Sequence, residues 1–202
     1  MEFAPELFVQ TSEILKNHRG FIENGMVLES WGVTDCQVIF ARKNLEILSS
    51  GELTLYKNTP DDTGFASYVI FNEGGKDFNI LNIHGKALPG DKMDTPVRLN
   101  QSKIMIDFFK DRNGAKIIGG DFNLMPDTKS IAMLEEVGYK NLIREFGIEE
   151  TRSQLNHKQY KEGEIQHFAD YVFISPEIKV KNFEVPYIEI SDHLPLILDF
   201  EV

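Results

Sequence analysis

The chain has little cysteine, little tryptophan and no long apolar run. Cys36 is the only cysteine among 202 residues, which excludes an internal disulfide and a zinc cluster built from cysteines. Trp occurs once but Phe 15 times, so we expect an aromatic core built mainly from Phe. No apolar run approaches the roughly 20 residues of a spanning helix, and no basic-led apolar segment opens the chain. We therefore expect a cytoplasmic protein without a transmembrane segment.

Positive charge is also scarce. Lys and Arg number 21 against 32 Asp and Glu, which gives a net charge of −11. This balance argues against tight, non-specific binding to nucleic acid, which relies on basic side chains that neutralise phosphates. It does not exclude a phosphate ester substrate, because a bound divalent cation can supply local positive charge. The length, with 42% hydrophobic and 26% charged residues, fits one globular domain over residues 1–202.

Apolar periodicity predicts strands interspersed with helices. Polar, irregular sequence fills 142–166, and Asn72–Lys76 is a strong turn. Helices are expected over 5–18, 95–112 and 127–137, and strands over 38–41, 45–56, 67–71, 78–84, 116–120, 171–175, 179–185 and 194–202. This order predicts an α/β (α+β) fold with sheets covered by helices. Turns between residues 35 and 84 are too short for helical crossovers, which disfavours an all-parallel doubly wound sheet.

The most informative segment is Ile117–Asp127, where a buried strand runs into Gly-Asp-Phe-Asn. On an extended backbone Asp121 and Asn123 would share one side of the strand. The carboxylate could hold a metal or a water, and the amide could hydrogen-bond a water or a phosphate oxygen. An ordinary Asx turn after a strand explains the same tetrapeptide equally well.

Two further segments place acids beside a histidine. Asp192 and His193 precede the last strand, and on an extended backbone their side chains would diverge, one toward a metal and one toward a substrate water. A neutral imidazole can take a proton near pH 7. Asp170 opens another apolar strand and could orient His193. Alone, each segment is more simply explained as a polar turn or a strand-end cap.

Other polar residues carry weaker signals. His84 ends an apolar strand, where a histidine often bonds only the backbone, and Asn82 shares its face. Arg98 and Gln101 lie one helical turn apart, a spacing that favours a solvated helix face over support of a site loop. We interpret three further histidines as surface or loop residues: His18, His157 and His167.

In their order along the chain, these segments resemble the endonuclease/exonuclease/phosphatase superfamily, which includes deoxyribonuclease I. The matching pieces cover about residues 31–202: Asn-x-His at 82–84, the helix with Arg98 and Gln101, Gly-Asp-Phe-Asn at 120–123, Asp-Tyr-Val-Phe-Ile-Ser at 170–175 and Ser-Asp-His at 191–193. The resemblance implies two packed β-sheets flanked by helices, a four-layer sandwich.

The resemblance also implies roles for individual residues. Asp121 and Asn123 match the pair that orients the attacking water and contacts the phosphate. His84 matches the histidine that binds the phosphate group.

The remaining implied roles belong to the last two segments. His193, with Asp170 as its partner, matches the histidine next to the attacking water or phosphate. Asp192 matches a metal-site carboxylate, with Asp121 as its helper. The usual cofactor in the family is Mg²⁺, sometimes Mn²⁺ or Ca²⁺.

One departure concerns the start of the chain. Family members begin with a strand that carries an asparagine and a second strand that ends in a glutamate, the main metal ligand. Here Gln10 and Glu13 lie on a helical pattern instead. We therefore expect an N-terminally incomplete member that lacks those strands, with weaker metal affinity because Mg²⁺ usually takes one or two carboxylates.

The sequence favours metal-dependent hydrolysis of a phosphodiester or phosphomonoester by activated water. The partner would be a phosphate ester substrate, either nucleic acid or a small molecule or lipid headgroup; no pattern specifies it or an oligomeric state. The alternative is an impaired or truncated relative that acts as a binding or interaction module. A serine hydrolase is weakly supported, because no Gly-x-Ser-x-Gly elbow accompanies Ser191.

Overall fold

The computed structural model describes residues 5–22, 26–28, 33–35, 37–59, 62–161 and 164–202. Cys36 lies outside these residues. The helices are α1 (Pro5–Ile14), α2 (Pro96–Phe109), α3 (Lys129–Glu136), α4 (Leu142–Glu145) and α5 (Gln154–His157). The strands are β1 (His18–Ile22), β2 (Met26–Leu28), β3 (Val33–Asp35), β4 (Val38–Arg42), β5 (Glu46–Thr59), β6 (Asp62–Glu73), β7 (Lys76–His84), β8 (Ala115–Asp121), β9 (Lys140–Asn141), β10 (Asp170–Ile174), β11 (Lys179–Glu184) and β12 (Ile197–Glu201). None of the described helices is long and apolar enough to cross a membrane.

A six-stranded sheet forms the centre, in the order β5-β6-β7-β8-β10-β9. Only β7 and β8 are parallel, and α2 forms the crossover between them. The other pairs are antiparallel, and between β6 and β7 the short turn at Gly74 and Gly75 requires this direction. The expectation against an all-parallel sheet is therefore confirmed.

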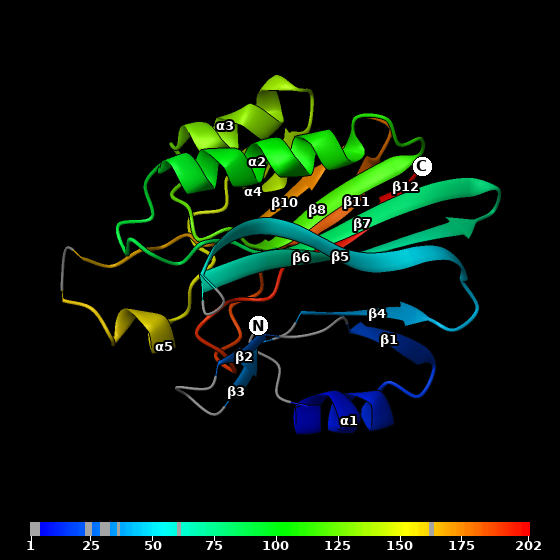
Figure 1. The fold of residues 1–202 in the computed structure, drawn as a ribbon, viewed down its shortest axis with the longest axis horizontal. Coiled ribbons are helices and arrows are strands. Elements are labelled where there is room, and N and C mark those ends of the chain that lie inside the picture. Colours follow the sequence, from blue (N-terminus) through cyan, green and yellow to red (C-terminus); the bar gives the residue numbers. More distant parts are fainter. Residues whose placement is uncertain (1–4, 23–25, 29–32, 36, 60–61, 162–163) are drawn as a thin grey trace.

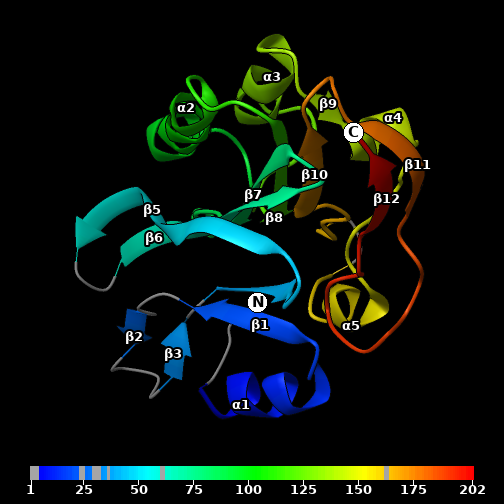
Figure 2. The same ribbon diagram turned by 90° about the vertical axis from the view of Figure 1, so that its right-hand side faces the viewer.

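The molecule is layered on both faces of this sheet (Figures 1 and 2). Helices α2 and α3 cover one face, where Tyr68 of β6 packs against Phe108 of α2. The opposite face carries two ribbons of two strands, β1–β4 and β11–β12. Phe71 of β6 and Phe78 of β7 stack with centroids 5.0 Å apart, and Phe78 also contacts Phe200 of β12. The expected mixed α/β layering is confirmed, and the second sheet layer consists of these separate ribbons.

Most predicted elements are present with small shifts in their ends. The N-terminal helix stops at Ile14 rather than at residue 18, because the chain turns there and pairs as β1 with β4. The segment 142–166, expected to be irregular, contains the single-turn helices α4 and α5. Asn141 and Ser153 cap their N-termini: the Asn141 side chain accepts two backbone N–H groups and the Ser153 hydroxyl accepts one.

The sheet register gathers three polar side chains in one row. His84 ends β7 beside Asp121, which ends β8, and Asp121 pairs in turn with Asp170, the first residue of β10. Gly120 has φ +127°, and a Cβ there would lie 2.2 Å from the carbonyl oxygen of Ile83. A glycine is thus required for the close approach of β8 to β7 that aligns this row.

Candidate active site

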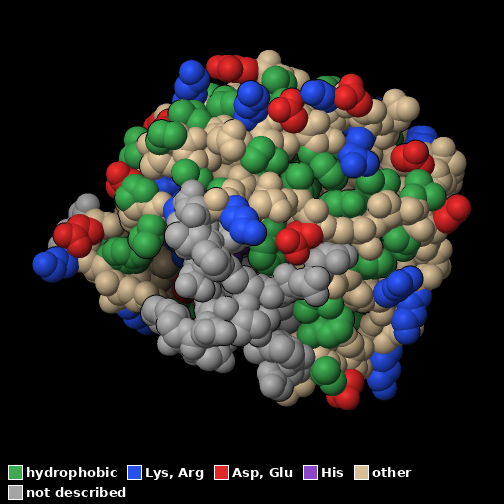
Figure 3. Space-filling view, in the orientation of Figure 1, with side chains coloured by type: hydrophobic (Ala, Val, Ile, Leu, Met, Phe, Trp, Pro, Cys, Tyr) green, Lys and Arg blue, Asp and Glu red, His purple; other side chains and the backbone are tan. Residues whose placement is uncertain are grey.

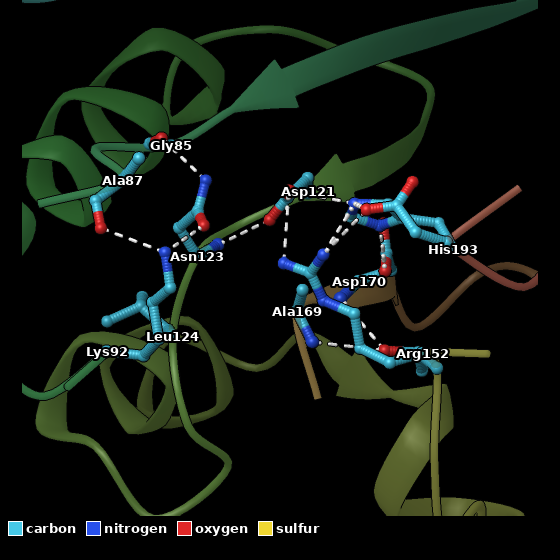
Figure 4. Close-up of polar contacts among 12 residues, drawn as sticks. Gly85, Ala87, Lys92, Asp121, Asn123, Leu124, Arg152, Ala169, Asp170 and His193 are labelled. Carbon is cyan, nitrogen blue, oxygen red and sulfur yellow. Dashed lines mark hydrogen bonds and ion pairs between the residues drawn. The ribbon is translucent and has the colours of Figure 1, made fainter. Parts of the chain in front are cut away.

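A cavity of about 720 Å³ lies over the row of strand ends. Its lining includes all six site residues expected from the sequence: His84, Asp121, Asn123, Asp170, Asp192 and His193. Figure 4 shows how Asp121, Asp170 and His193 converge with Arg152. Residues from four distant parts of the chain therefore meet at one edge of the sheet.

His193 and Asp170 form a hydrogen-bonded pair, with Nδ1 of the imidazole 2.8 Å from Oδ2 of the carboxylate. Asp170 is buried, and the hydroxyl oxygen of Thr151 accepts the backbone N–H groups of Ala169 and Asp170. Burial raises the pKa of the Asp170 carboxyl, and the hydrogen bond from His193 opposes that rise. Burial alone would lower the pKa of His193, but the hydrogen bond to Asp170 and the charges of Asp170 and Asp121 outweigh it and raise that pKa.

Arg152 is the main site residue that sequence reasoning missed. Its side chain is buried, and one guanidinium nitrogen lies 2.8 Å from Nε2 of His193. Because a guanidinium can only donate, Nε2 must accept, so in this arrangement the imidazole is neutral and carries its proton on Nδ1. A raised pKa favours the charged imidazolium, which would place two donors face to face. We therefore expect Arg152 to move away from Nε2 when His193 is protonated.

The same guanidinium faces the carboxylates. Its nitrogens lie 3.8 Å from Oδ2 of Asp121 and 3.5 Å from Oδ2 of Asp192. Nε of Arg152 is buried and has no hydrogen-bond partner among the described residues. An isolated bridge pairs the backbones of Arg152 and His193, and Ser153 N donates to the Asp192 carbonyl. The loop before β10 thus carries a cation into the site, although no sequence motif in 142–166 predicts it.

Asp121 and Asn123 are arranged differently from the expectation. Asn123 has φ +53°, so the backbone is not extended and strand alternation does not apply. Instead Asn123 N donates to Oδ1 of Asp121 at 2.7 Å, the Asx turn considered as the simpler explanation. The turn and the metal or water role are compatible, because Oδ2 of Asp121 remains directed at Arg152 and His193.

Lys92 is a second residue that the sequence did not indicate. Its ammonium donates to Oδ1 of Asn123 at 2.6 Å and to the Ala87 carbonyl at 2.8 Å (Figure 4). Burial lowers the pKa of Lys92 to about 8. The other end of the Asn123 amide donates to the Gly85 carbonyl at 3.0 Å. With both ends of the amide engaged, Asn123 links two loops and fixes Asp121 in this state.

Asp192 and His193 do not diverge as expected. The segment is a turn rather than a strand, and Oδ2 of Asp192 lies 3.8 Å from Nε2 of His193, so both side chains face Arg152. Asp121, Asp170 and His193 also offer ligand atoms that lie within 4.8 Å of one another. Carboxylate oxygens are the donors that Mg²⁺ prefers, so Asp121 and Asp192 fit this ion in kind. Arg152 competes with it for the same two carboxylates.

The expectation of a solvated helix face at Arg98 and Gln101 is wrong. Both are buried on α2. The Arg98 guanidinium donates to four carbonyls of the loop after β7, those of Lys86, Ala87, Pro89 and Met93. Oε1 of Gln101 accepts the Lys86 N–H at 3.3 Å. The two side chains therefore hold the loop that delivers Lys92, because its carbonyls have no sheet partners to satisfy them.

The structure also locates His157, His167 and Glu13, all of which lie outside the cavity. His157 is buried, which contradicts its interpretation as a surface or loop residue, whereas the side chain of His167 is half exposed in a loop. Glu13 is exposed on α1, in the layer beyond the β1–β4 ribbon. The helical pattern expected at Gln10 and Glu13 is thus confirmed.

No model of a protein family matches the chain, and no curated protein matches it in sequence. Solved structures match in fold. An endonuclease/exonuclease/phosphatase from Bacteroides vulgatus is 20% identical, with a TM-score of 0.79 over 100% of this chain and 82% of that one. A mannosyl-6-phosphatase from Bacteroides thetaiotaomicron is 17% identical (TM-score 0.73; 100% and 83%), and the human Nocturnin catalytic domain with bound sulfate is 18% identical (0.74; 99% and 78%). The resemblance stated from the motifs is confirmed at the level of architecture, and the chain has the fold of the endonuclease/exonuclease/phosphatase structures.

Proposed function

We propose that this chain hydrolyses a phosphate ester by attack of a water molecule that His193 activates. The observation that carries the proposal is the hydrogen-bonded pair of His193 and Asp170. The other imidazole nitrogen, Nε2, faces Asp121 and Arg152 in the cavity. Attack of water on an anionic phosphate requires a base held by a carboxylate, with a cation close by. The fold likeness to phosphatase and nuclease structures supports this class of reaction.

Each residue has a defined task in this scheme. Nε2 of His193 takes a proton from the water, and the water oxygen forms the new bond to phosphorus as the ester P–O bond breaks. The leaving oxygen keeps the electron pair of that bond and takes up a proton, so that an alcohol is released. Asp170 accepts a hydrogen bond from Nδ1–H and so keeps Nε2 unprotonated; Nε2 becomes available to the water once Arg152 turns from it to the phosphate. Asp121, fixed by the N–H of Asn123, accepts the second hydrogen of the water and orients it.

Arg152 and His84 are placed to hold the phosphate. A guanidinium pairs with phosphate through two parallel hydrogen bonds, and Nε of Arg152 lacks a partner among the described residues. His84 lines the same cavity from the end of β7. Asn123 contributes by position here, because both ends of its amide are already engaged.

We further propose that Asp192 and Asp121 hold Mg²⁺, with Mn²⁺ or Ca²⁺ as substitutes. When bound, the ion would neutralise charge on the phosphoryl oxygens. Asp192 is the more accessible of the two carboxylates, with 44% of its side chain exposed against 11% for Asp121. Release of both from Arg152 is therefore part of binding, and it frees the guanidinium for the substrate.

The substrate that fits best is a small phosphate ester, a single-stranded nucleic acid or a lipid phosphate. Basic and acidic side chains alternate over α2 and α3, and no continuous basic band crosses the described part of the face in Figure 3. With a net charge of −11, duplex DNA would find few phosphate contacts. Arg152 brings a positive charge into the cavity, and the buried Lys92 donates to Asn123 of its lining.

The test compares turnover of p-nitrophenyl phosphate and bis-p-nitrophenyl phosphate across a Mg²⁺ titration. We expect His193→Ala and Asp121→Ala to abolish turnover, while Asp107→Ala, which removes an exposed acid of α2, leaves it unchanged. Wild-type turnover in either active-site variant would reject the assignment. Phosphate binding without turnover at any Mg²⁺ concentration would favour the binding-module alternative.

A further inference from the structure

A second group of metal-ligating side chains lies outside the active-site cavity. Oε2 of Glu150 is 3.2 Å from Nδ1 of His167 and 3.6 Å from Nε2 of His157. The ligand atoms of all three residues lie within 4.8 Å of one another. Glu150 precedes the segment with Arg152, His157 ends α5, and His167 stands before β10. Three separate parts of one long loop therefore direct nitrogen and oxygen donors at a common point.

The buried Nε2 of His157 indicates a ligand at this point. The residue is 6% exposed, and its Nε2 is buried with no hydrogen-bond partner among the described residues. An unsatisfied buried polar atom is destabilising, because it has given up its hydrogen bonds to water without gaining another. A hydrogen bond between Glu150 and His167 accounts for the 3.2 Å contact, but it leaves Nε2 of His157 without a partner. The lone pair of a neutral imidazole is a common metal donor.

We propose that Glu150, His157 and His167 bind one divalent transition metal ion of the zinc class. Bonds from Zn²⁺ to nitrogen and oxygen measure about 2.0–2.2 Å, so two donors on a tetrahedron lie roughly 3.4 Å apart. The two distances from Glu150, 3.2 and 3.6 Å, lie on either side of this value. Two imidazoles with one carboxylate suit Zn²⁺ better than Mg²⁺, which prefers oxygen. The half-exposed side of His167 leaves the fourth position to water.

The site would fix the backbone that presents Arg152. The carbonyl of His167 accepts the backbone N–H groups of Thr151 and Arg152 at 2.7 and 3.2 Å. Thr151 in turn accepts the N–H of Asp170 through its hydroxyl. An ion held between Glu150 and His167 would therefore hold together the two loop segments that these hydrogen bonds join. The proposed ion has a positioning role and does not touch the substrate.

Titration with Co²⁺ tests the site, because tetrahedral Co²⁺ absorbs visible light and reports imidazole ligands. We expect one Co²⁺ per chain in the wild type, displaced by Zn²⁺. Loss of an outer partner of a metal site costs 10–100-fold in affinity, so loss of a ligand in Glu150→Gln or His167→Ala should weaken binding by about 100-fold or more. Glu149→Gln is the matched control, since Glu149 is an exposed neighbour of the same charge. Equal affinity in Glu150→Gln and Glu149→Gln would overturn the proposal, as would wild-type protein without the tetrahedral spectrum.

Two further measurements separate this site from the active-site carboxylates. Asp192→Asn should keep the Co²⁺ spectrum, because Asp192 is not a ligand here; its loss in that variant would overturn the assignment. Zn²⁺ should also slow amide hydrogen exchange at Thr151 and Arg152 in the wild type and not in His167→Ala. Neither measurement uses substrate, so the outcome is independent of the proposed hydrolysis.

Discussion

At the scale of single residues, the chemistry of the site depends on how His193 is protonated. Asp170 and Arg152 act on its imidazole from opposite sides and in opposite senses. Asp170 raises the pKa of His193 through a hydrogen bond and its charge, whereas the charge of Arg152 lowers it. Substitution of either neighbour should therefore move the pH profile in a predictable direction.

Asp170→Asn should lower the pKa of His193, because it removes the carboxylate that stabilises the imidazolium. The proposed base would work in its neutral form, so kcat/KM in the wild type should rise with pH through a pKa above 6.5, the ordinary value. In Asp170→Asn this limb should move to lower pH while kcat falls by roughly 10²–10⁴. Histidine-detected NMR titration checks the shift without relying on turnover. An unchanged His193 pKa would show that the pair is not coupled.

Arg152→Gln should have the opposite effect on His193 and should also strengthen Mg²⁺ binding. The variant removes a positive charge near the imidazole, so the His193 pKa should rise further. It also frees Asp121 and Asp192 from the guanidinium that lies 3.8 and 3.5 Å away. Isothermal titration with Mg²⁺ measures the second effect, and Arg144→Gln, an arginine paired with Glu135 on the surface, is the control. Weaker Mg²⁺ binding in Arg152→Gln would mean that the arginine does not compete for these carboxylates.

At the scale of elements, the loop after β7 depends on α2. The Arg98 side chain is fully buried, and among the described residues its one ion pair is with the exposed Asp91 at 3.5 Å. Its other bonds go to loop carbonyls. Burial lowers the pKa of the Arg98 guanidinium, but an arginine remains charged in proteins. The loop therefore folds around a buried cation rather than around an apolar core.

Arg98→Met should destabilise the chain by about 3 kcal/mol or more, since several buried carbonyls would lose their donors at roughly 1–3 kcal/mol each. Lys103→Met on the same helix removes an exposed charge and should change stability by less than about 0.5 kcal/mol. Urea unfolding measures both. If the loop rather than the whole chain yields, amide exchange should rise first at Lys86 and Lys92. Equal stability of the two variants would contradict this role of Arg98.

Element prediction succeeded where apolar periodicity and turn residues agree. The strand before Gly-Asp-Phe-Asn, the hairpin at Gly74 and Gly75, and α2 with its Thr95 cap all follow local rules. Arg152 and Lys92 could not be found in this way, because each is placed by long-range contacts of an irregular loop. The burial of Arg98, Gln101 and His157 has the same cause. Partners distant in sequence, not local spacing, decide whether such side chains face solvent.

At the scale of the whole molecule, the residues named from sequence lie in one cavity because the sheet order is fixed. β7 and β8 are parallel and β10 is antiparallel to β8, so the end of two strands and the start of the third share an edge. The predicted α/β architecture is thus enough to bring His84, Asp121 and Asp170 into a row. The loops that approach this row supply the cations, and they are the part that the sequence did not reveal.

Net charge should make the reaction respond to salt in an unusual direction. A chain of charge −11 repels an anionic substrate at long range, and the Debye length falls from about 30 Å at 0.01 M to about 8 Å at 0.15 M salt. Over this range we expect kcat/KM to rise, and to rise more for doubly charged p-nitrophenyl phosphate than for singly charged bis-p-nitrophenyl phosphate. The buried Arg152 is less screened than surface charges, so attraction within the cavity should persist. A steep fall with salt for both substrates would instead indicate a basic surface that releases counterions, and it would reverse the preference for small phosphate esters.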